Sequence, residues 1–581
     1  MLLTRICVIF TAIFTTALSS AATTLSTEAW FTSSYHPEEP YPEQSDPMLQ
    51  KKKNVGIAFS GGGTRSYLCS LGYLRGLHDL GLLKNVKYMS GVSGGAWATV
   101  VYSYYQKQKT TKARPVAQSD EELLGDIIEP EMCTFDTLNK MSKTSARYSA
   151  TASLNEDLVA NFLRYKSIPE AWIHQVAAQF IERYGIDMDD SFTWNASSLQ
   201  NILDRNPTLT SDQFVLPSTP DRPYPIFVGT HEGPIKGAPF PEHQRTFSGF
   251  DFTPLYVGAR ELRNRTWAKY GGGPPITKLM GGVVEPFAFG SAAPSTGLHE
   301  PHGLLNVPIS SSGKLFSLNS AIALSSYFLG GAVTTLGPLP FRRADKLGMV
   351  IPTFPVAGEH VPTTTDMVFS DGGCVIQPDL IGLIKRNVTS IILFLNLEIP
   401  LTGRNKWNPL NRPPSGSDHE VDDDFPAFFG LRNNDTSQMG YDLHNNQVFK
   451  QHEFAQVAYD MQTSQLNGNG CIATSTHTTI ANDFWNVKAG FTVNVTWVYL
   501  SRAYNWEKKL PTDVHAMFPT AEDPTQLPTN LPFLQLEYTN FPNFITFTQL
   551  QFFDGSANLL SNLCGWVTKA NKEIFQAVLG D

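Results

Sequence analysis

Residues 55–65 read VGIAFSGGGTR and residues 86–95 read VKYMSGVSGG, and these two stretches decide the fold. Each begins with a short apolar run and leads directly into a glycine-rich turn. A run of this length next to turn residues is typical of a strand buried on both faces. We therefore expect strands over residues 55–59 and 86–90, paired in the core of one sheet.

Helical periodicity follows each of the two turns. Leucines recur at every third position from residue 68 to residue 80, and Gly81 ends the run. Residues 96–106 continue with few polar side chains. Alternating strands and helices build a parallel sheet covered by helices. We therefore predict an α/β fold whose central, mainly parallel sheet is sandwiched by helices.

Length and charge exclude several classes of protein. The chain has 581 residues, of which 41% are hydrophobic and 17% are charged, as in a folded globular protein. Its net charge is −9, and no basic stripe runs along it. Nucleic-acid-binding proteins carry such a stripe, so we expect no nucleic-acid partner. The sequence leaves the oligomeric state open.

The first residues resemble a signal peptide. Arg5 precedes an apolar stretch over residues 6–18, and small residues follow at 19–22. A membrane-spanning helix needs about 20 apolar residues, which neither this stretch nor any later one provides. We expect cleavage after residue 22 and a location outside the cell or in the lumen of an endolysosomal or vacuolar compartment.

The rest of the chain divides into a leader and one domain. Residues 23–53 lack periodicity, so we predict an irregular leader there and a single catalytic domain over 54–581. Within the domain, Pro-rich segments over about 107–250 and about 400–440 are predicted to be cap insertions, since long loops are often lids. Five cysteines remain after cleavage, too few for a disulfide framework in so long a chain.

Glycan acceptors agree with the secretory route. Five asparagines begin an N-x-Ser/Thr triplet, which predicts glycans on surface loops of a chain that enters a secretory lumen. They are Asn195, Asn264, Asn387, Asn434 and Asn494.

Ser93 is the candidate nucleophile. It stands in Gly91-Val92-Ser93-Gly94-Gly95 between an expected strand and an expected helix, where small neighbours allow a strained turn to expose a hydroxyl. Residues 60–65 supply a second turn, whose side-chain-free positions leave backbone N–H groups for an anion. Arg65 follows at the start of the next helix, and a guanidinium there can bind a phosphate.

A third motif lies far along the chain. Residues 367–369 form an apolar run that leads into Ser370-Asp371-Gly372-Gly373, and residues 390–397 form another buried strand. Because the ends of such strands gather at one edge of a sheet, Asp371 can reach the edge where Ser93 lies.

These motifs together resemble the catalytic domain of cytosolic-type phospholipases A and lysophospholipases (phospholipase B), which are related to patatin. The motifs at 61–65, 91–95 and 371–373 agree most closely, and the segments 250–258, 494–500 and 541–544 follow in order. One departure is at 374–378, which reads CVIQP where many members have Asn-x-Pro.

The resemblance implies a Ser–Asp dyad that hydrolyses fatty-acyl esters. Ser93 would be the nucleophile and Asp371 the base, made more basic by burial. The amides of Gly62 and Gly63 would form the oxyanion hole, and Arg65 would bind the head-group phosphate. The expected partner is a phospholipid or lysophospholipid at a membrane or micelle surface. We expect no cofactor and no metal.

Three other interpretations remain open at this point. The pattern G-x-S-x-G also fits a Ser-His-Asp triad of an α/β-hydrolase, with His477 or His515 following Asp371 in the required order. The protein could instead be an inactive secreted lipid-binding protein that has kept the pocket. A metal enzyme has the least support, since the acidic run at 418, 420 and 422–424 lacks the spacing of a calcium loop and is interpreted as a solvated loop.

Overall fold

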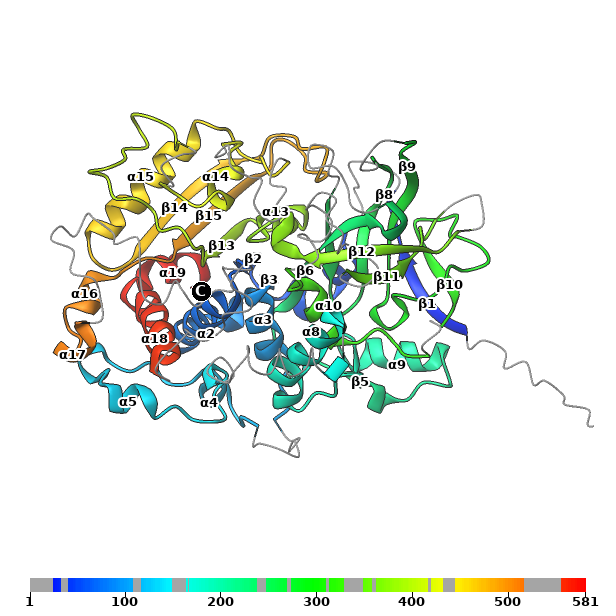
Figure 1. Cartoon of the computed structure of the whole chain (residues 1–581), viewed down its shortest axis with the longest axis horizontal. Helices are drawn as coiled ribbons and strands as arrows, with labels where there is room; N and C mark the ends of the chain where they lie inside the picture. The colour runs from blue at the N-terminus through cyan, green and yellow to red at the C-terminus, as the bar shows by residue number, and fades with distance from the viewer. Residues whose placement is uncertain are drawn as a thin grey trace, which may run out of the picture.

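A mixed sheet forms the centre of the computed structural model (Figure 1). Its middle strands run parallel in the order β6 (Tyr224–Pro234), β3 (Tyr88–Val92), β2 (Val55–Phe59), β13 (Ser390–Leu395) and β15 (Thr492–Tyr499). The structure describes residues 24–32, 40–107, 116–148, 164–165, 167–237, 247–268, 273–309, 313–328, 348–357, 362–415, 420–431, 445–516 and 555–580. The expected mainly parallel centre of an α/β fold is therefore present.

Antiparallel strands extend the sheet on both sides. Beyond β6 follow β7 (Ser248–Phe252), β8 (Val257–Trp267), β9 (Ile276–Val284), β1 (Thr24–Trp30) and β10 (His302–Pro308). Beyond β15 lies β14 (Cys471–Thr478), and β11 (Met349–Thr353) pairs with β12 (Thr365–Asp371). A separate short pair joins β4 (Ser191–Phe192) to β5 (Phe214–Val215).

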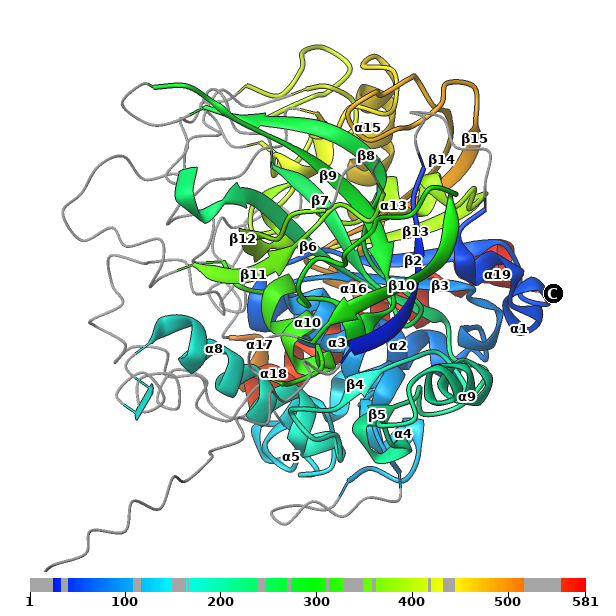
Figure 2. The same ribbon diagram turned by 90° about the vertical axis from the view of Figure 1, so that its right-hand side faces the viewer.

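Helices cover both faces of the parallel strands. In Figures 1 and 2, α2 (Gly63–Asp79), α3 (Gly94–Tyr104) and α18 (Gly555–Ala570) lie on one side, and α13 (Leu380–Lys385) and α15 (Glu453–Leu466) lie on the other. Helix α18 packs closely along α2, since a Cβ at Gly72 would lie 2.2 Å from the carbonyl oxygen of Ser561. The distant C-terminal helix thus completes the core around the first glycine turn.

The remaining α-helices are short and lie around this centre. They are α1 (Pro47–Gln50), α4 (Asp120–Leu124), α5 (Phe135–Asn139), α8 (Ile168–Val176), α9 (Ala196–Arg205), α10 (Leu318–Ser325), α14 (Asp424–Ala427), α16 (Tyr504–Glu507), α17 (Thr512–His515) and α19 (Lys572–Leu579). None of the helices in these described ranges is long and apolar enough to cross a membrane.

The βαβα unit forms where the two opening motifs predict it. Strand β2 spans the expected residues 55–59, and β3 begins two residues later than expected because Val86 caps the short 3₁₀ helix Leu83–Asn85. All five residues of each strand are buried, as a strand covered by helices on both faces requires.

The leader and the cap differ from expectation. The sequence predicts an irregular segment at residues 24–30, yet they form β1 and pair with β10 and β9. The buried positions of β1 alternate with polar ones, a period-2 pattern too short and polar to stand out. Strand β6 lies inside the range predicted as a cap, and all eleven of its residues are buried. Its two prolines and two glycines favour a loop when only the local composition of the strand is considered.

Candidate active site

Two strands meet end to end beside β6, and this meeting creates the site. Strand β3 pairs with the first half of β6, where Val92 is opposite Val228. Strand β12 pairs with the second half of the same edge in the opposite direction, where Asp371 is opposite Gly229. Because neighbouring residues of a strand are about 3.3 Å apart, the ends of β3 and β12 face each other at close range. Ser93 and Asp371 are brought together in this way.

Ser93 occupies a strained turn between β3 and α3. Its φ is 51° and its ψ is −118°, a conformation that a residue with a side chain rarely adopts. Such a backbone costs on the order of 1–3 kcal/mol and persists only where the surroundings impose it. Here a Cβ at Gly91 would lie 2.5 Å from the carbonyl oxygen of Gly95, so the turn closes only with glycines around the serine. The geometry is that of a nucleophile elbow.

The glycine cradle, residues 61–63, lies directly against this elbow. Gly62 has a φ of 122° and Gly63 a φ of 53°, so both adopt backbone conformations that favour glycine. A Cβ at Gly94 would lie 2.0 Å from the carbonyl oxygen of Gly63. Since Gly63 is the first residue of α2, its N–H is one of the unpaired donors at a helix N-terminus. The backbones of the cradle and the elbow are therefore in direct contact.

Asp371 is buried beside Ser93. Its side chain is 7% exposed, and the N–H of Gly373 donates to its Oδ1 at 2.8 Å. The N–H of Asp371 donates to the carbonyl oxygen of Tyr327, which fixes the strand end. Within the described ranges no hydrogen bond joins the Ser93 hydroxyl to this carboxylate. Catalytic hydrogen bonds often tighten only when substrate binds.

Arg65 lies deeper than the phosphate-binding role suggests. Its side chain is 2% exposed, and its Nε donates to the carbonyl oxygen of Asn396 at 3.0 Å. The backbone N–H of Asn396 in turn donates to Ser60 Oγ at 2.8 Å. These bonds tie the start of α2 to the end of β13. Contact between Arg65 and a head group remains a prediction.

Three polar residues of the site had no sequence signal: Gln377 is half-buried, and Asp379 and Asn396 are buried. Gln377 Oε1 accepts a hydrogen bond from the N–H of Gly61 at 3.1 Å. Asp379 accepts from Ser90 Oγ at 2.7 Å, three residues before Ser93, and its burial raises its pKa to about 7. Asn396 was missed because it is a single amide at the end of an apolar strand. Its hydrogen bonds with Arg65 and Ser60 become visible only in the tertiary structure.

The alternative triad through His477 is not built. His477 lies on β14, which is separated from β3 by β2, β13 and β15. With about 4.8 Å between neighbouring strands, the histidine is on the order of 19 Å from the elbow. Its Nδ1 is 2.6 Å from Glu453 Oε2, and its Nε2 is 2.6 Å from Ser475 Oγ. His477 thus belongs to a separate Ser–His–Glu array that joins β14 to α15. His515 ends α17.

The described part of the acidic run, residues 420–424, is not a solvated loop, and Asp418 lies outside the described residues. Glu420 is 2% exposed and Asp424 is 6% exposed. Glu420 pairs with Arg412, and Asp424 accepts a hydrogen bond from Gln377 Nε2. Neighbouring phenylalanines draw the segment into the core, which local composition did not indicate. In the part of the chain that the structure describes, no group of three or more His, Cys, Asp or Glu side chains is placed to hold a metal ion.

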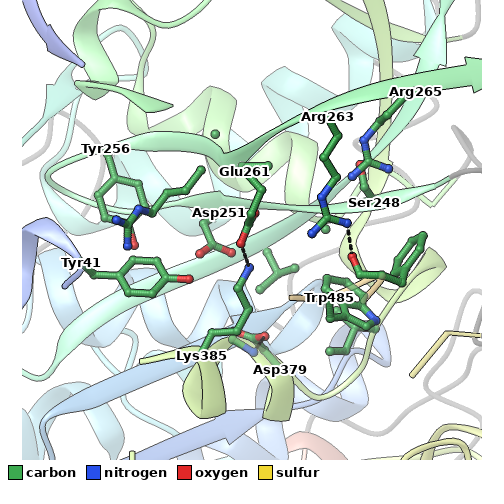
Figure 3. Close-up of a pocket in the computed structure, with 18 residues that line it drawn as sticks. Tyr41, Ser248, Asp251, Tyr256, Glu261, Arg263, Arg265, Asp379, Lys385 and Trp485 are labelled. Carbon is green, nitrogen blue, oxygen red and sulfur yellow. Dashed lines mark hydrogen bonds and ion pairs between the residues drawn. The ribbon is translucent and has the colours of Figure 1, made fainter. Parts of the chain in front are cut away.

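A polar cleft is lined in part by the segment that follows Asp371, and Figure 3 shows the acidic and basic side chains that line it. Ile376 and Asp379 of that segment line the cleft. Lys385 Nζ and Glu261 Oε1, which also line it, form an ion pair at 2.7 Å. Its volume of about 40 Å³ leaves room for a few water molecules, each of which needs about 10–15 Å³. The cleft is too small for an acyl chain, and Ser93 does not line it.

The predicted glycan acceptors are not equivalent. Asn264, Asn387 and Asn494 are exposed. Asn195 caps α9, and its Nδ2 donates to Asp46 at 3.2 Å. Asn434, the signal peptide and the segment 541–544 lie outside the described residues. The five described cysteines are buried, and no disulfide forms among them.

Comparison with known proteins finds a family match for the part of the chain that contains the elbow and the cradle. Residues 57–216 match the family model described as patatin-like phospholipase. Cytosolic phospholipase A2 gamma of Mus musculus is 28% identical over 204 residues, which are 35% of this chain and 26% of that protein. Cytosolic phospholipase A2 zeta of Mus musculus is 29% identical over 231 residues, which are 39% of this chain and 21% of that protein.

A yeast protein and a solved human structure are also similar to this chain. A putative meiotic phospholipase of Saccharomyces cerevisiae, SPO1, is 28% identical over 159 residues, which are 25% of this chain and 24% of that protein. The solved structure of human GIVD cytosolic phospholipase A2 aligns with 92% of this chain and 64% of its own chain, with a TM-score of 0.43 and 13% identity. The matched segments thus span about a quarter of the length of the curated relatives. Two of these relatives are named cytosolic phospholipases, whereas the sequence of this chain predicts a secretory route.

Proposed function

We propose, for a chain whose residues 57–216 are a patatin-like phospholipase domain, that it hydrolyses fatty-acyl esters of phospholipids or lysophospholipids at a membrane or micelle surface. One observation supports this most strongly. Strands β3 and β12 end against each other beside β6, so that the elbow of Ser93 and the end of β12 at Asp371 lie next to each other. A Ser–Asp pair beside a backbone-amide cradle is suited to acyl transfer.

The reaction proceeds through an acyl-serine. As Ser93 Oγ attacks the ester carbonyl, its proton passes to Asp371, and the carbonyl oxygen becomes an oxyanion. The amides of Gly62 and Gly63 stabilise this charge, and one such donor contributes on the order of 3 kcal/mol. The lysolipid or glycerol alkoxide leaves with the proton from Asp371. Water then attacks the acyl-serine and loses its proton to Asp371. As the tetrahedral intermediate collapses, Asp371 returns that proton to Ser93 Oγ, and the fatty acid is released.

Two substitutions and a fluorophosphonate test this mechanism. Ser93→Ala removes the nucleophile and Asp371→Asn removes the base, so each is expected to lower ester hydrolysis by at least about 10³-fold in a folded protein. The assay is product mass spectrometry on a panel of phospholipids and lysophospholipids. Turnover near the wild-type rate in either variant contradicts the dyad.

The second array supplies the matched control. Ser475 also has a histidine and a carboxylate behind it, but its hydroxyl accepts a hydrogen bond from Trp497 Nε1 at 2.8 Å. Ser475→Ala is therefore expected to keep full activity. Peptide mapping of the fluorophosphonate adduct is expected to find it on Ser93. An adduct on Ser475 would indicate that the second array is the active site. No adduct at all would favour a lipid-binding protein.

We propose a secretory or endolysosomal lumen as the place of action. The composition of residues 1–22 and the exposed acceptors Asn264, Asn387 and Asn494 support this location. Phosphate binding by Arg65 is part of the same proposal. It requires that the guanidinium, whose Nε donates to the carbonyl of Asn396, also reach the head group.

A further inference from the structure

Gln377 lies between the two halves of the site. It follows the short turn after Asp371 and precedes α13, in the CVIQP segment where the sequence departs from the family pattern. Its Oε1 accepts the N–H of Gly61 at 3.1 Å, and its Nε2 donates to Asp424 Oδ2. One side chain thereby connects the glycine cradle, the Asp371 loop and helix α14.

The amide oxygen of Gln377 is close to both reactive residues. A Cβ placed on Gly61 would lie 2.4 Å from this oxygen and 3.2 Å from Ser93 Cβ. A Cβ placed on Gly373 would lie 3.0 Å from the same oxygen and 3.2 Å from Asp371 Oδ1. Both glycines therefore leave space that the amide of Gln377 fills. The side chain of Gln377 therefore lies close to both Ser93 and Asp371.

Asp424 fixes which way the amide of Gln377 points. Its Oδ2 accepts a hydrogen bond, so it selects the NH₂ group, and the amide oxygen must then face the N–H of Gly61. Burial raises the pKa of Asp424. A flipped amide would place its NH₂ group against the N–H of Gly61, donor to donor, and that backbone N–H cannot accept. Asp424 is itself held in place, since it is 6% exposed and lies at the start of α14.

We propose that Gln377 is a positioning residue that holds the Gly61 amide and so sets the distance between the glycine cradle and Ser93. Because Gly61 uses its N–H to bind Gln377, the amides of Gly62 and Gly63 are left for the oxyanion. The side chain has the length needed to span from its own loop to both Gly61 and Asp424. This inference rests on the proposed acyl-hydrolase function and adds a residue that sequence motifs do not indicate.

Gln377→Asn tests the reach of the side chain, because it keeps the amide but shortens the chain by one methylene. It cannot hold Gly61 and Asp424 together, so the cradle shifts. We expect kcat per active site to fall about 10- to 100-fold, as misplacements of about 1 Å do, while KM changes less than about threefold. Active sites are counted with a fluorophosphonate, so that misfolded protein does not enter the rate.

Two further positions separate positioning from stability. Gln462→Asn is the control, because Gln462 is a buried glutamine away from the site, whose Nε2 donates to two carbonyls, those of Thr402 and Trp407. It is expected to lower Tm with kcat per site unchanged. Asp424→Asn keeps an oxygen for Gln377 Nε2 and is expected to stay within about threefold of wild type, whereas Asp424→Leu removes the acceptor and is expected to resemble Gln377→Asn.

The outcomes distinguish the positioning role from the proposed function. If Ser93→Ala still hydrolyses lipid, or if wild type hydrolyses none, the proposed function fails regardless of Gln377. If Ser93→Ala is inactive while Gln377→Asn has the wild-type kcat per site, the positioning role alone is overturned. The rate of fluorophosphonate labelling of Ser93 makes the same distinction without any lipid. Should Gln377→Asn fail to fold, Asp424→Leu decides: wild-type kcat per site overturns the role, and a loss of the expected size supports it.

Discussion

Gly94→Ala tests the contact between elbow and cradle that the proposed mechanism requires. Gly94 follows Ser93, and a Cβ there would lie 2.0 Å from the carbonyl oxygen of Gly63 and 2.9 Å from its nitrogen. Those atoms belong to the cradle that is expected to bind the oxyanion. The added methyl group cannot rotate away, because both partners are backbone.

The magnitude follows from the shift that this contact demands. Ordinary contacts to a Cβ lie at 3.4–4 Å, so the Gly63 backbone must move by more than about 1 Å. A misplacement of that size costs about 10²-fold in rate. Overpacking of this kind also destabilises by about 1–3 kcal/mol. Helix propensity alone would favour alanine by about 1 kcal/mol in α3, so the two effects predict opposite signs for the change in stability.

The assay compares kcat, fluorophosphonate labelling of Ser93 and Tm with those of a control glycine variant. Gly303→Ala in β10 meets only the tip of Leu298, at 3.1 Å, and is expected to change none of the three. For Gly94→Ala we expect a fall of about 100-fold in both rates and a lower Tm. A Gly94→Ala protein with wild-type kcat and a raised Tm would refute the packing of elbow against cradle.

Two other predictions concern pH and glycans. Burial, and then the charge of Asp251, raise the pKa of Asp379 from 3.8 to about 7, so the folded state keeps a proton that the unfolded state loses. The contribution of Asp379 to the free energy of unfolding is greatest below about pH 4. It falls as the pH rises to about 7, by a few kcal/mol at most. Asp379→Asn is expected to flatten the Tm–pH curve in that window, and a parallel curve contradicts it. Enzymatic deglycosylation of protein expressed through a secretory pathway is expected to report occupancy at Asn264, Asn387 and Asn494 and least at Asn195, whose nitrogen already donates to Asp46. Absence of any glycan would argue against the lumenal location.

The sequence by itself determined the first half of the site. The strand, turn and helix sequences around residues 55–65 and 86–95 predict their own structure, because apolar runs and glycines act through neighbouring residues. The left-handed φ of Gly63 and the strained turn at Ser93 are local properties, and the motif reveals both. The same holds for the helical repeat that forms α2.

Tertiary structure alone decided how the second half meets the first. Strand β12 approaches from the opposite direction and shares one edge of β6 with β3, although the composition around β6 predicts part of a cap. Pairing between strands far apart in sequence depends on hydrogen bonds that no local pattern specifies. For the same reason β1, the burial of Arg65 and the bridge from Gln377 to Gly61 could not be predicted. Local chemistry identified Ser93 and Asp371, and long-range pairing brought them together.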